Sequence, residues 1–452
     1  MSHTALAFVL AAGLGTRMRS ETCKVLHHAA GKPLLAHVLE AVAAAGARPV
    51  VVLSPESEPA RAILPPDALV AIQDPPRGTG DALRVALAAA DASAGQAYII
   101  YGDTPLLRPA TLERLRALLE ARGAVLALLS ACVGPDNAYG RVVRDERGDV
   151  RRIVEARLAT AEERALPESS LGAYAADLAW LREAAARLQP NETGEIFLTD
   201  LVAIARADGR VVAAHRTDEG EEGMGVNTRL DLAAADRALR RRILEEHMRA
   251  GVTFIDPPSS SVDAGVSIAA DVTIDRGTIL EGHTAIATGS RIGPYAVLRD
   301  TRVGARCRVQ ASFLEGATLE DEVRVGPYAH LRPGAHLERG VELGNFGEVK
   351  NARIGAGTKM HHFSYIGDAD IGERVNIGAG TVTLNYDGVR KQRTEVGDDA
   401  FIGSDTLLRA PVRVGAGAVT GAGSVVTKDV PAGMVAVGMP ARAIKKAERR
   451  RR

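Results

Sequence analysis

The chain has 452 residues, in which 56 lysine and arginine residues balance 56 aspartate and glutamate residues; 46% of the residues are hydrophobic and only 4% are aromatic. This length predicts two or three domains with buried cores, and the hydrophobic content excludes a disordered chain. The zero net charge argues against a general nucleic-acid-binding surface and gives no electrostatic reason for membrane attachment. Because 18 of the 46 glycines fall in residues 1–250 and 28 in residues 251–452, we expect two halves of different structure.

Cysteine usage and the N-terminus indicate a cellular compartment. Cys23, Cys132 and Cys307 are far apart in the sequence and show no paired metal-ligand spacing, which is typical of reduced thiols. No basic leader precedes a long apolar segment, and no apolar run approaches the roughly 18 residues of a membrane-spanning helix. We therefore expect a cytoplasmic protein with no membrane and no nucleic-acid partner.

Up to residue 227, short aliphatic runs alternate with segments rich in alanine and leucine. This alternation is typical of a Rossmann-like α/β domain with a mostly parallel sheet, in which ligands bind beyond the carboxyl ends of the strands. Helices are predicted after each of the first four strands. The predicted strands are residues 7–10, 50–53, 69–73, 97–101 and 125–131.

The segment after the first predicted strand has the composition of a phosphate-binding loop. It contains Gly13 and Gly15, followed by Arg17 and Lys24. Glycines let the backbone approach an anion, and backbone amides and cationic side chains supply positive potential. The spacing matches neither of the common phosphate-loop patterns, so a tight turn is the alternative. Only eight of the 56 basic residues are lysine and none lies in residues 33–349, which makes Lys24 the stronger phosphate-binding candidate.

Two further strand ends carry polar side chains. Asp103 follows Gly102 after the fourth predicted strand, where a carboxylate can hold Mg²⁺ against a substrate phosphate; a helix N-cap or turn is an equal alternative. Gln73 ends the third predicted strand and is followed by the glycine loop at residues 78–80. Its amide can contact the edge of a base while the loop holds the nucleotide, and the alternative is an exposed strand end.

A long helix and a set of turn residues divide the chain. The helix has an apolar stripe and a run of three arginines on its other side. Gly251 and the prolines of residues 256–258 end it. We therefore expect an α/β domain at 1–227, a linker helix at 228–251, a second domain at 252–436 and a basic tail at 437–452.

The second domain is dominated by a hexapeptide repeat. A period of six residues over this length indicates a parallel β-helix, in which each repeated aliphatic side chain points inward and about 18 residues form one coil. The repeat is broken once, by an insertion at residues 384–394. The recurring residues are Ile268, Ile274, Leu280, Ile286, Ile292, Leu298, Val303, Val309, Leu314, Leu319, Val325, Leu331, Leu337, Leu343, Val349, Ile354, Ile366, Ile371, Ile377, Val396, Ile402, Leu408, Val414, Thr420 and Val426.

One histidine of the second domain stands out by its neighbours. His362 lies 17 residues after Asn345 and 17 before Ala379, so these three residues should stack on successive coils. Tyr365 and Asn376 each precede an inward residue and should face outward. A single outward histidine on a β-helix is more often a surface residue than a catalytic base, so its role depends on the polar residues around it.

The motifs of the first half resemble those of the sugar-phosphate nucleotidyltransferases. Residues 10–18 meet the signature L-x-A-G-x-G-T-R-[ML], and the resemblance continues to residues 225–227. It implies transfer of a nucleotidyl group to a sugar 1-phosphate, with Arg17 and Lys24 as catalytic phosphate-neutralising residues and Asp103 and Asn227 as Mg²⁺ ligands. The nucleotide and sugar would be bound by Leu10, Ala11, Ala12, Gly13, Lys24, Gln73, Gly78, Thr79, Tyr101, Gly102, Asp103, Gly140, Glu155, Ser170 and Asn227.

The motifs of the second half resemble those of left-handed β-helix acyltransferases. Ordered strings such as LRPGA, NIGAGT and NYDG make the whole chain similar to the bifunctional N-acetylglucosamine-1-phosphate uridyltransferases and glucosamine-1-phosphate acetyltransferases. This resemblance implies UTP, acetyl-CoA and both sugar phosphates as substrates, a homotrimer, and His362 as general base. Acetyl-acceptor residues would be Arg332, Lys350, Tyr365, Asn376, Asn385 and Lys391; acetyl-CoA residues would be Ala379, Asn385, Tyr386, Ser404, Ala422 and Arg442.

The chain departs from the family pattern at three positions. Ser170 stands where family members carry Asn, Leu14 replaces a common lysine, and Gly438 occupies the place of a coenzyme-contacting arginine, for which Arg442 is the nearest substitute. Two other interpretations stay open at this point. One is a nucleotidyltransferase whose β-helix serves only trimerisation or regulation, and the other is an inactive scaffold.

Overall fold

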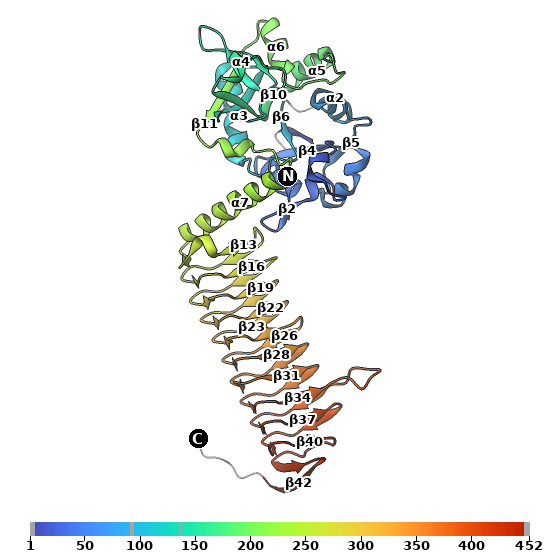
Figure 1. Cartoon of the computed structure of the whole chain (residues 1–452), viewed down its shortest axis with the longest axis vertical. Coiled ribbons are helices and arrows are strands. Elements are labelled where there is room, and N and C mark those ends of the chain that lie inside the picture. Colours follow the sequence, from blue (N-terminus) through green and yellow to red (C-terminus); the bar gives the residue numbers. More distant parts are fainter. Residues whose placement is uncertain (1–4, 91–94, 135–136, 447–452) are drawn as a thin grey trace. The chain divides into compact units, whose positions relative to one another are not determined.

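The computed structural model describes residues 5–90, 95–134 and 137–446. These residues form two compact units that divide within helix α7 (Arg229–Arg249), between Leu239 and Arg240 (Figure 1). The helix lies where the sequence predicted a linker helix. No helix of the described part of the chain combines the length and apolar character needed to cross a bilayer.

Within the described residues, the first unit contains a nine-stranded sheet with the order β11-β7-β10-β6-β1-β4-β5, and β8 and β9 extend from β10. Strands β1, β4, β5 and β6 pair in parallel, whereas β10 runs antiparallel to both β6 and β7. The strands are β1 (Ala5–Leu10), β4 (Ala47–Leu53), β5 (Leu69–Ile72), β6 (Gln96–Tyr101), β7 (Leu126–Cys132), β8 (Arg141–Arg144), β9 (Val150–Val154), β10 (Glu168–Asp177) and β11 (Val212–Thr217); a separate hairpin is β2 (His28–Ala29) with β3 (Lys32–Pro33).

Both faces of this sheet are buried. Leu6 and Phe8 of β1 pack into one core cluster, while Ala7 and Val9 pack into the cluster on the opposite face. Helices therefore cover both sides, as a parallel sheet requires. The helices are α1 (Leu34–Ala44), α2 (Thr79–Ala89), α3 (Pro109–Arg122), α4 (Ala161–Arg164), α5 (Leu178–Arg187) and α6 (Asp200–Ala207), with 3₁₀ turns η1 (Thr16–Met18), η2 (Lys24–Leu26), η3 (Pro55–Ile63) and η4 (Gly220–Gly223).

The five strands predicted from the sequence are present. The segment after the second of them forms the 3₁₀ helix η3 and not an α-helix, and it contains Pro59. Proline has no backbone N–H to continue an α-helical hydrogen-bond ladder. The sequence analysis missed β10, the antiparallel strand that lies in the middle of the sheet.

The second unit is a left-handed parallel β-helix with three sheets, which we call face 1, face 2 and face 3. Among the described residues they contain twelve, ten and nine strands. All the recurring residues named from the sequence are buried. Met360 and Thr383 are also inward residues, at 1% exposure each, and the repeat count had passed over them.

The strand bounds follow the repeat, and a short 3₁₀ turn, η5 (Pro257–Ser259), precedes the first full coil. Face 1 consists of β12 (Thr253–Phe254), β15 (Thr273–Ile274), β18 (Arg291–Ile292), β21 (Arg308–Val309), β24 (Arg324–Val325), β27 (Glu342–Leu343), β30 (Lys359–Met360), β33 (Asn376–Ile377), β36 (Phe401–Ile402), β39 (Val419–Thr420), β41 (Met434–Gly438) and β42 (Ala441–Lys446). Face 2 consists of β13 (Ser261–Val262), β16 (Ile279–Glu281), β19 (Val297–Arg299), β22 (Phe313–Glu315), β25 (His330–Leu331), β28 (Gly347–Lys350), β31 (Ser364–Gly367), β34 (Val382–Leu384), β37 (Leu407–Arg409) and β40 (Val425–Val426). Face 3 consists of β14 (Ser267–Ile268), β17 (Ala285–Ile286), β20 (Arg302–Val303), β23 (Thr318–Leu319), β26 (Ala335–Leu337), β29 (Ala352–Ile354), β32 (Ala369–Ile371), β35 (Thr394–Val396) and β38 (Val412–Val414).

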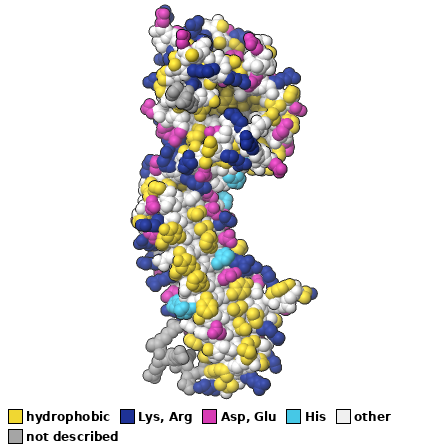
Figure 2. All heavy atoms as spheres, viewed as in Figure 1, with side chains coloured by type: hydrophobic (Ala, Val, Ile, Leu, Met, Phe, Trp, Pro, Cys, Tyr) yellow, Lys and Arg dark blue, Asp and Glu magenta, His cyan; other side chains and the backbone are white. Residues whose placement is uncertain are grey.

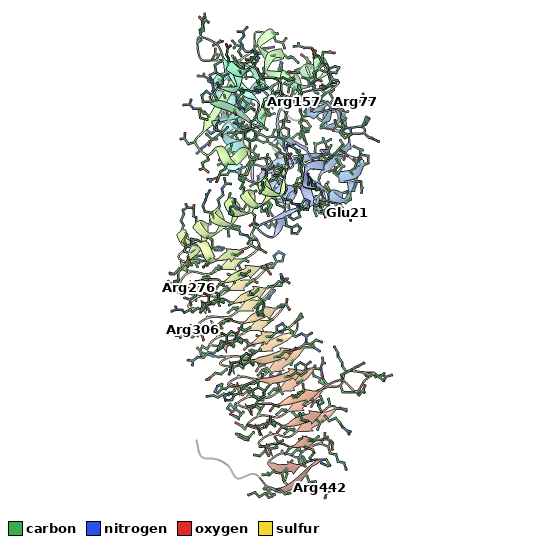
Figure 3. The ribbon with its side chains drawn as sticks, viewed as in Figure 1. Glu21, Arg77, Arg157, Arg276, Arg306 and Arg442 are labelled. Carbon is green, nitrogen blue, oxygen red and sulfur yellow. The ribbon has the colours of Figure 1, made fainter. Side chains whose placement is uncertain are left out.

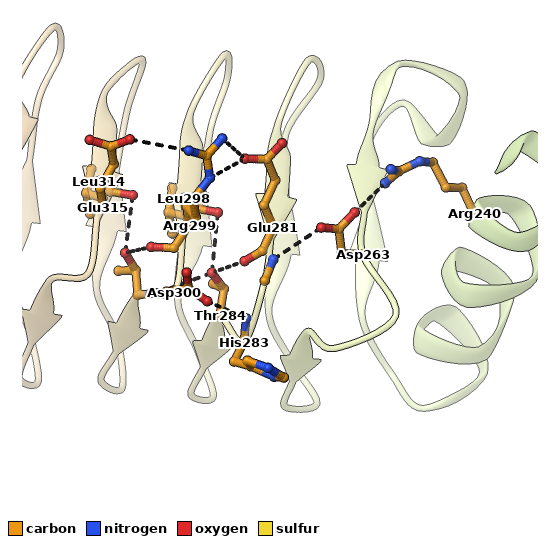
Figure 4. Close-up of polar contacts among 12 residues, drawn as sticks. Arg240, Asp263, Glu281, His283, Thr284, Leu298, Arg299, Asp300, Leu314 and Glu315 are labelled. Atoms are coloured by element: carbon orange, nitrogen blue, oxygen red, sulfur yellow. Dashed lines mark hydrogen bonds and ion pairs between the residues drawn. The ribbon is translucent and has the colours of Figure 1, made fainter. Parts of the chain in front are cut away.

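Polar ladders hold successive coils together outside and inside the core. The buried Thr284 hydroxyl lies 2.8 Å from the carbonyl oxygen of Glu281 and 3.3 Å from that of Leu298 (Figure 4). Outside, the Arg299 guanidinium lies between the carboxylates of Glu281, at 2.7 Å, and Glu315, at 3.6 Å. The buried hydroxyl therefore bonds backbone carbonyls from two coils, and an aliphatic residue in its place would remove these contacts.

The end of the β-helix differs from the sequence prediction of a basic tail at 437–452. Strands β41 and β42 form an antiparallel hairpin on face 1, and Ala436, at 1% exposure, pairs with Thr420 of the preceding coil. Residues 437–446 are therefore part of the sheet. The rest of the predicted tail, residues 447–452, lies outside the described residues.

Candidate active sites

The first unit contains a cavity of about 1110 Å³ at the carboxyl ends of β1 and β6. All the residues proposed from the sequence for this unit line the cavity, with the exception of Gly102. The backbone N–H of Gly102 donates to the Leu10 carbonyl (2.9 Å), and a Cβ atom at this position would lie 2.8 Å from the Ala11 Cβ. Gly102 therefore brings the ends of β6 and β1 together, and its contact with the nucleotide stays a prediction.

Three of the predicted residues meet at one point of the cavity. The Lys24 ammonium pairs with the Asp103 carboxylate and donates to Asn227 Oδ1 at 3.1 Å. Lys24 and Asp103 are 79 positions apart in the sequence, and Lys24 and Asn227 are 203 positions apart. The oxygens of Asp103 and Asn227 thus converge on a cationic group.

The glycine loop is shaped to admit Lys24. Gly15 has a φ of +62°, and a Cβ atom there would lie 2.7 Å from the Lys24 Cβ. Both the left-handed backbone and the close approach therefore require glycine at this position. Arg17 also lines the cavity, whereas Leu14 does not and is 54% exposed.

Gln73 is buried, at 3% exposure, so the alternative of an exposed strand end is wrong. Its side-chain nitrogen donates to the Gly78 carbonyl at 3.0 Å and to Asp81 Oδ2 at 2.8 Å. Both N–H groups are therefore used within the protein, and the amide oxygen is the group left to accept a hydrogen bond from a ligand. The Thr79 hydroxyl accepts the backbone N–H of Leu198 at 3.1 Å.

The opposite wall of the cavity carries a buried carboxylate. Burial raises the pKa of Glu155, and a hydrogen bond from Thr199 Oγ1 to Glu155 Oε1, at 2.8 Å, opposes that rise. Ser170 Oγ lies 3.1 Å from the hydroxyl of Tyr174, a buried residue that also lines the cavity. The sequence analysis missed Thr199 and Tyr174, and neither lies in one of the recognised motifs.

In the second unit, five of the six predicted acetyl-acceptor residues, all but Asn376, lie on or beside face 2 and form a polar cluster. Asn385 Nδ2 donates to Asp368 Oδ2 at 2.5 Å and lies 3.4 Å from the Tyr365 hydroxyl. Lys391 lies beside Lys350 and lowers the pKa of the Lys350 ammonium. Two ammonium groups that repel each other here form a site suited to a doubly charged anion. Arg332 is at the edge of the same face, where it pairs with Glu348 at 2.9 Å.

The predicted base lies at a corner of the β-helix. His362 lies between β30 of face 1 and β31 of face 2, and Asn376 begins β33 of face 1. Tyr365 and Asn376 face outward as predicted, but they belong to different faces. A single chain therefore does not bring Asn376 into the face 2 cluster.

The small residues predicted to bind acetyl-CoA continue this corner. Ala379, Ser404 and Ala422 each lie between a face 1 strand and a face 2 strand. Backbone bonds link their turns, since Asp405 N donates to the Ala379 carbonyl at 2.6 Å and Gly423 N to the Ser404 carbonyl at 2.8 Å. The corner is therefore a regular ladder without large side chains.

Two further predicted residues lie apart from this ladder. The insertion leaves the corner between face 2 and face 3 and carries Tyr386, which is 61% exposed. Arg442 is on the terminal strand β42 (Figure 3). Gly438 has a φ of +104°, so the hairpin turn disfavours the arginine that the family carries there.

Similarity to known proteins covers both units. Residues 7–138 match the family described as MobA-like NTP transferase domain, and residues 393–428 match the hexapeptide repeat of succinyl-transferase. The chain is 45% identical over 437 residues to a protein of Bordetella parapertussis, covering 95% of each chain, and 44% identical to one of Heliobacterium modesticaldum, covering 96% of this chain and 95% of that protein. It is 47% identical to a protein of Alkalilimnicola ehrlichii, covering 94% of this chain and 91% of that protein; all three are named Bifunctional protein GlmU. This chain therefore belongs to the family of bifunctional GlmU proteins, and it is an enzyme of UDP-N-acetylglucosamine synthesis with uridyltransferase and acetyltransferase activity.

Proposed function

We propose that the two reactions use the two sites described above. The face 2 cluster and the His362 corner acetylate glucosamine 1-phosphate with acetyl-CoA, and the cavity of the first unit then joins the product to UMP from UTP and releases pyrophosphate. The observation that carries the proposal is the convergence of Lys24, Asp103 and Asn227 in a cavity large enough for a nucleotide and a sugar phosphate.

The cavity suits a bound Mg²⁺. Carboxylate and amide oxygens are donors that Mg²⁺ accepts, and those of Asp103 and Asn227 already converge on a positive group. The described residues contain no cluster of three or more His, Cys, Asp or Glu side chains with metal-binding geometry, so substrate phosphates would complete the coordination. When bound, Mg²⁺ supplies charge neutralisation for the phosphates of UTP.

The protein contributes alignment and positive charge to uridylyl transfer. Arg17 and Lys24 neutralise the negative charge of the phosphate groups that take part in the transfer. The free amide oxygen of Gln73 accepts a hydrogen bond from the N–H of the uracil ring. The site therefore favours a base that carries a hydrogen-bond donor at that edge. Glu155 and Ser170, on the opposite wall, bind sugar hydroxyls and hold the attacking phosphate in line.

Acetyl transfer needs a base for the amine of glucosamine 1-phosphate. His362 removes the proton as the nitrogen attacks the thioester carbonyl, and coenzyme A departs as the free thiol once its sulfur takes up a proton; histidine is a common general base for such a step. Lys350, Lys391 and Arg332 bind the phosphate, and Tyr365 orients the sugar. Asn376 and Asn385 also contact the acceptor, and acetyl-CoA lies along the corner ladder of Ala379, Ser404 and Ala422. Tyr386 and Arg442, which lie apart from this ladder in one chain, contact the coenzyme as well.

We further propose that three chains assemble into a homotrimer. Tyr365 and Asn376 lie on different faces of one chain, so a second chain is needed to complete a site that uses both. An exposed apolar surface supports the assembly: hydrophobic side chains gather along the β-helix (Figure 2), and the aromatic rings of Tyr328 and Phe346 stack at 5.5 Å. Outside the insertion, the aromatic residues of the β-helix that are more than half exposed are Tyr295, Phe313, Tyr328, Phe346 and Phe363.

Two assays on the purified enzyme test the assignment. Thiol release from acetyl-CoA with glucosamine 1-phosphate reports acetylation, and pyrophosphate release from UTP with N-acetylglucosamine 1-phosphate reports uridylyl transfer. His362→Ala should abolish the first and spare the second, whereas Asp103→Ala should do the reverse. Loss of both reactions in either well-folded variant would contradict the two-site assignment. Sedimentation as a monomer with full acetyltransferase activity would contradict the trimer.

The compartment stays a prediction. The free thiols of Cys23, Cys132 and Cys307 agree with the reduced cysteines expected from the sequence, and we propose a location in the cytoplasm on that basis.

A further inference from the structure

Face 1 of the β-helix carries a groove that neither proposed site uses. Two adjoining cavities of about 390 Å³ and 410 Å³ lie along its outer surface, and they share Arg308 and Gln310. The first begins near Arg276 (Figure 3), and the second ends at His361, the residue before the proposed base His362. The groove therefore leads along face 1 to the proposed acetyltransferase site.

Positive charge on this groove is only partly neutralised. Arg291, Arg308 and Arg324 occupy the same position on three successive coils, where neighbouring strands are about 4.8 Å apart. Asp275 neutralises Arg291 through two bonds of 2.7 Å and 2.9 Å. In the described part of the chain, no carboxylate lies within ion-pairing distance of Arg308 or Arg324. Two unpaired guanidinium groups thus stack on adjacent coils and repel each other.

The floor beside these arginines is made by residues without side chains. Gly293, Gly326 and Gly344 line the cavities. A Cβ atom at Gly326 would lie 2.1 Å from the Gln310 carbonyl oxygen, and one at Gly344 would lie 2.0 Å from that of His361. Glycine at these positions therefore lets the backbones of successive coils approach closely beside the cavities.

The remaining acidic group of the groove is already paired. Glu342 accepts a hydrogen bond from His361 Nε2 at 2.9 Å and lies 3.6 Å from Lys359 Nζ. The hydrogen bond to His361 lowers the pKa of Glu342, and Lys359 on the adjacent strand β30 adds to the effect, so this carboxylate already has partners within the protein. Arg324, on the preceding coil, also lowers the pKa of Glu342. The four arginines that line the two cavities still outnumber their two carboxylates, so the groove stays positive.

We propose that the arginine groove of face 1 binds the phosphate group of a sugar phosphate and holds the acetyl acceptor close to His362 before it enters the acetyltransferase site. Guanidinium groups bind phosphate oxygens in pairs, and adjacent forks can hold one phosphate between them. A positive surface beside a site also raises the rate at which anionic substrates reach it. The inference rests on the proposed acetyltransferase site, because the groove ends there.

Chemical protection of individual arginines tests the binding directly. The full-length protein is treated with phenylglyoxal, which modifies exposed guanidinium groups, and modified positions are located by mass spectrometry. Glucosamine 1-phosphate and inorganic phosphate should each slow modification of Arg308 and Arg324, whereas glucosamine without phosphate should not. Arg302 is the matched control, since it is an outward arginine on face 3 with no ion pair in the described structure. Its modification should be the same with and without ligand.

Steady-state kinetics test the consequence for catalysis. In the double variant Arg308→Gln/Arg324→Gln, kcat/KM for glucosamine 1-phosphate should fall about threefold to tenfold at low salt, with kcat unchanged and a weaker dependence on ionic strength. Arg302→Gln should leave kcat/KM unchanged. Pyrophosphate release by the first unit should be unaffected in both variants.

Two results of the labelling experiment would overturn the proposal. Equal modification of Arg308 and Arg302 with and without phosphate would mean that the groove does not bind the anion. Arginines that resist modification until the chains are separated would show that the groove is covered by a second copy. Protection does not require turnover. If phosphate still protected Arg308 in an enzyme that did not acetylate glucosamine 1-phosphate, the proposed acetyltransferase site would be refuted and the phosphate site would stand.

Discussion

The hydroxyl of Thr199 gives the sharpest test of how the first site holds its sugar. Thr199 precedes α6, but its side chain makes no helix-capping bond; it donates to buried Glu155 at 2.8 Å. Thr199→Val keeps the branched shape and removes only this donor. A hydrogen bond to a charged group contributes about 1.5 to 3 kcal/mol, so the Glu155 carboxylate loses that stabilisation and its pKa rises further.

In uridylyl transfer, Thr199→Val should weaken binding of the sugar phosphate. If the free energy of sugar-phosphate binding falls by about 1.4 kcal/mol, KM for N-acetylglucosamine 1-phosphate rises about tenfold. KM for UTP and the acetyltransferase rate should stay unchanged. Pyrophosphate release at varied sugar phosphate measures the effect. Thr193→Val is the matched control, because Thr193 lines the same cavity and its hydroxyl bonds Asn191 at 2.8 Å.

The outcome separates positioning from simple destabilisation. A variant that has lost stability but keeps the wild-type KM would show that Thr199 serves the fold alone. Equal kinetic effects of Thr199→Val and Thr193→Val would show that the hydrogen bond to Glu155 has no specific role. Either result would refute the assignment of Glu155 to sugar binding through Thr199.

Three other variants probe the charges and the β-helix core. Lys391→Met should raise the pKa of Lys350, since Lys391 is the main cause of its lowering, and NMR titration of the ε-amine measures the change. Glu155→Gln should stabilise the fold at pH above the raised carboxyl pKa, where ionisation of the buried group is costly, and the gain should vanish as pH falls below the unfolded value of 4.5, as measured by urea unfolding across pH. A stability difference independent of pH would contradict this. Leu331→Ala should destabilise the β-helix by about 2 to 5 kcal/mol in the same measurement, because Leu331 is fully buried; a loss below 1 kcal/mol would mean that neighbouring coils close the cavity.

The face of each residue in the β-helix could be predicted from the sequence, because one aliphatic position in six must point inward. Periodicity predicts that Tyr365 and Asn376 face outward, and both do. Local patterns also located the first phosphate loop and its strand. The antiparallel strand β10 could not be predicted in this way, since its pairing with β6 and with β7 depends on contacts between segments far apart in the chain. The terminal hairpin was missed because its basic composition conceals the pairing of β41 with β42.

The sequence by itself determined the repeat, the motif order and the residue types available for chemistry. Only the tertiary structure decided which of them meet. Lys24 reaches Asp103 and Asn227 because the carboxyl ends of neighbouring strands share one edge of a sheet, and the absence of a side chain at Gly102 allows the close approach of β6 to β1. The arginine groove of face 1 likewise follows from coil stacking, which places side chains 16 to 17 residues apart at neighbouring positions and leaves their charges unpaired.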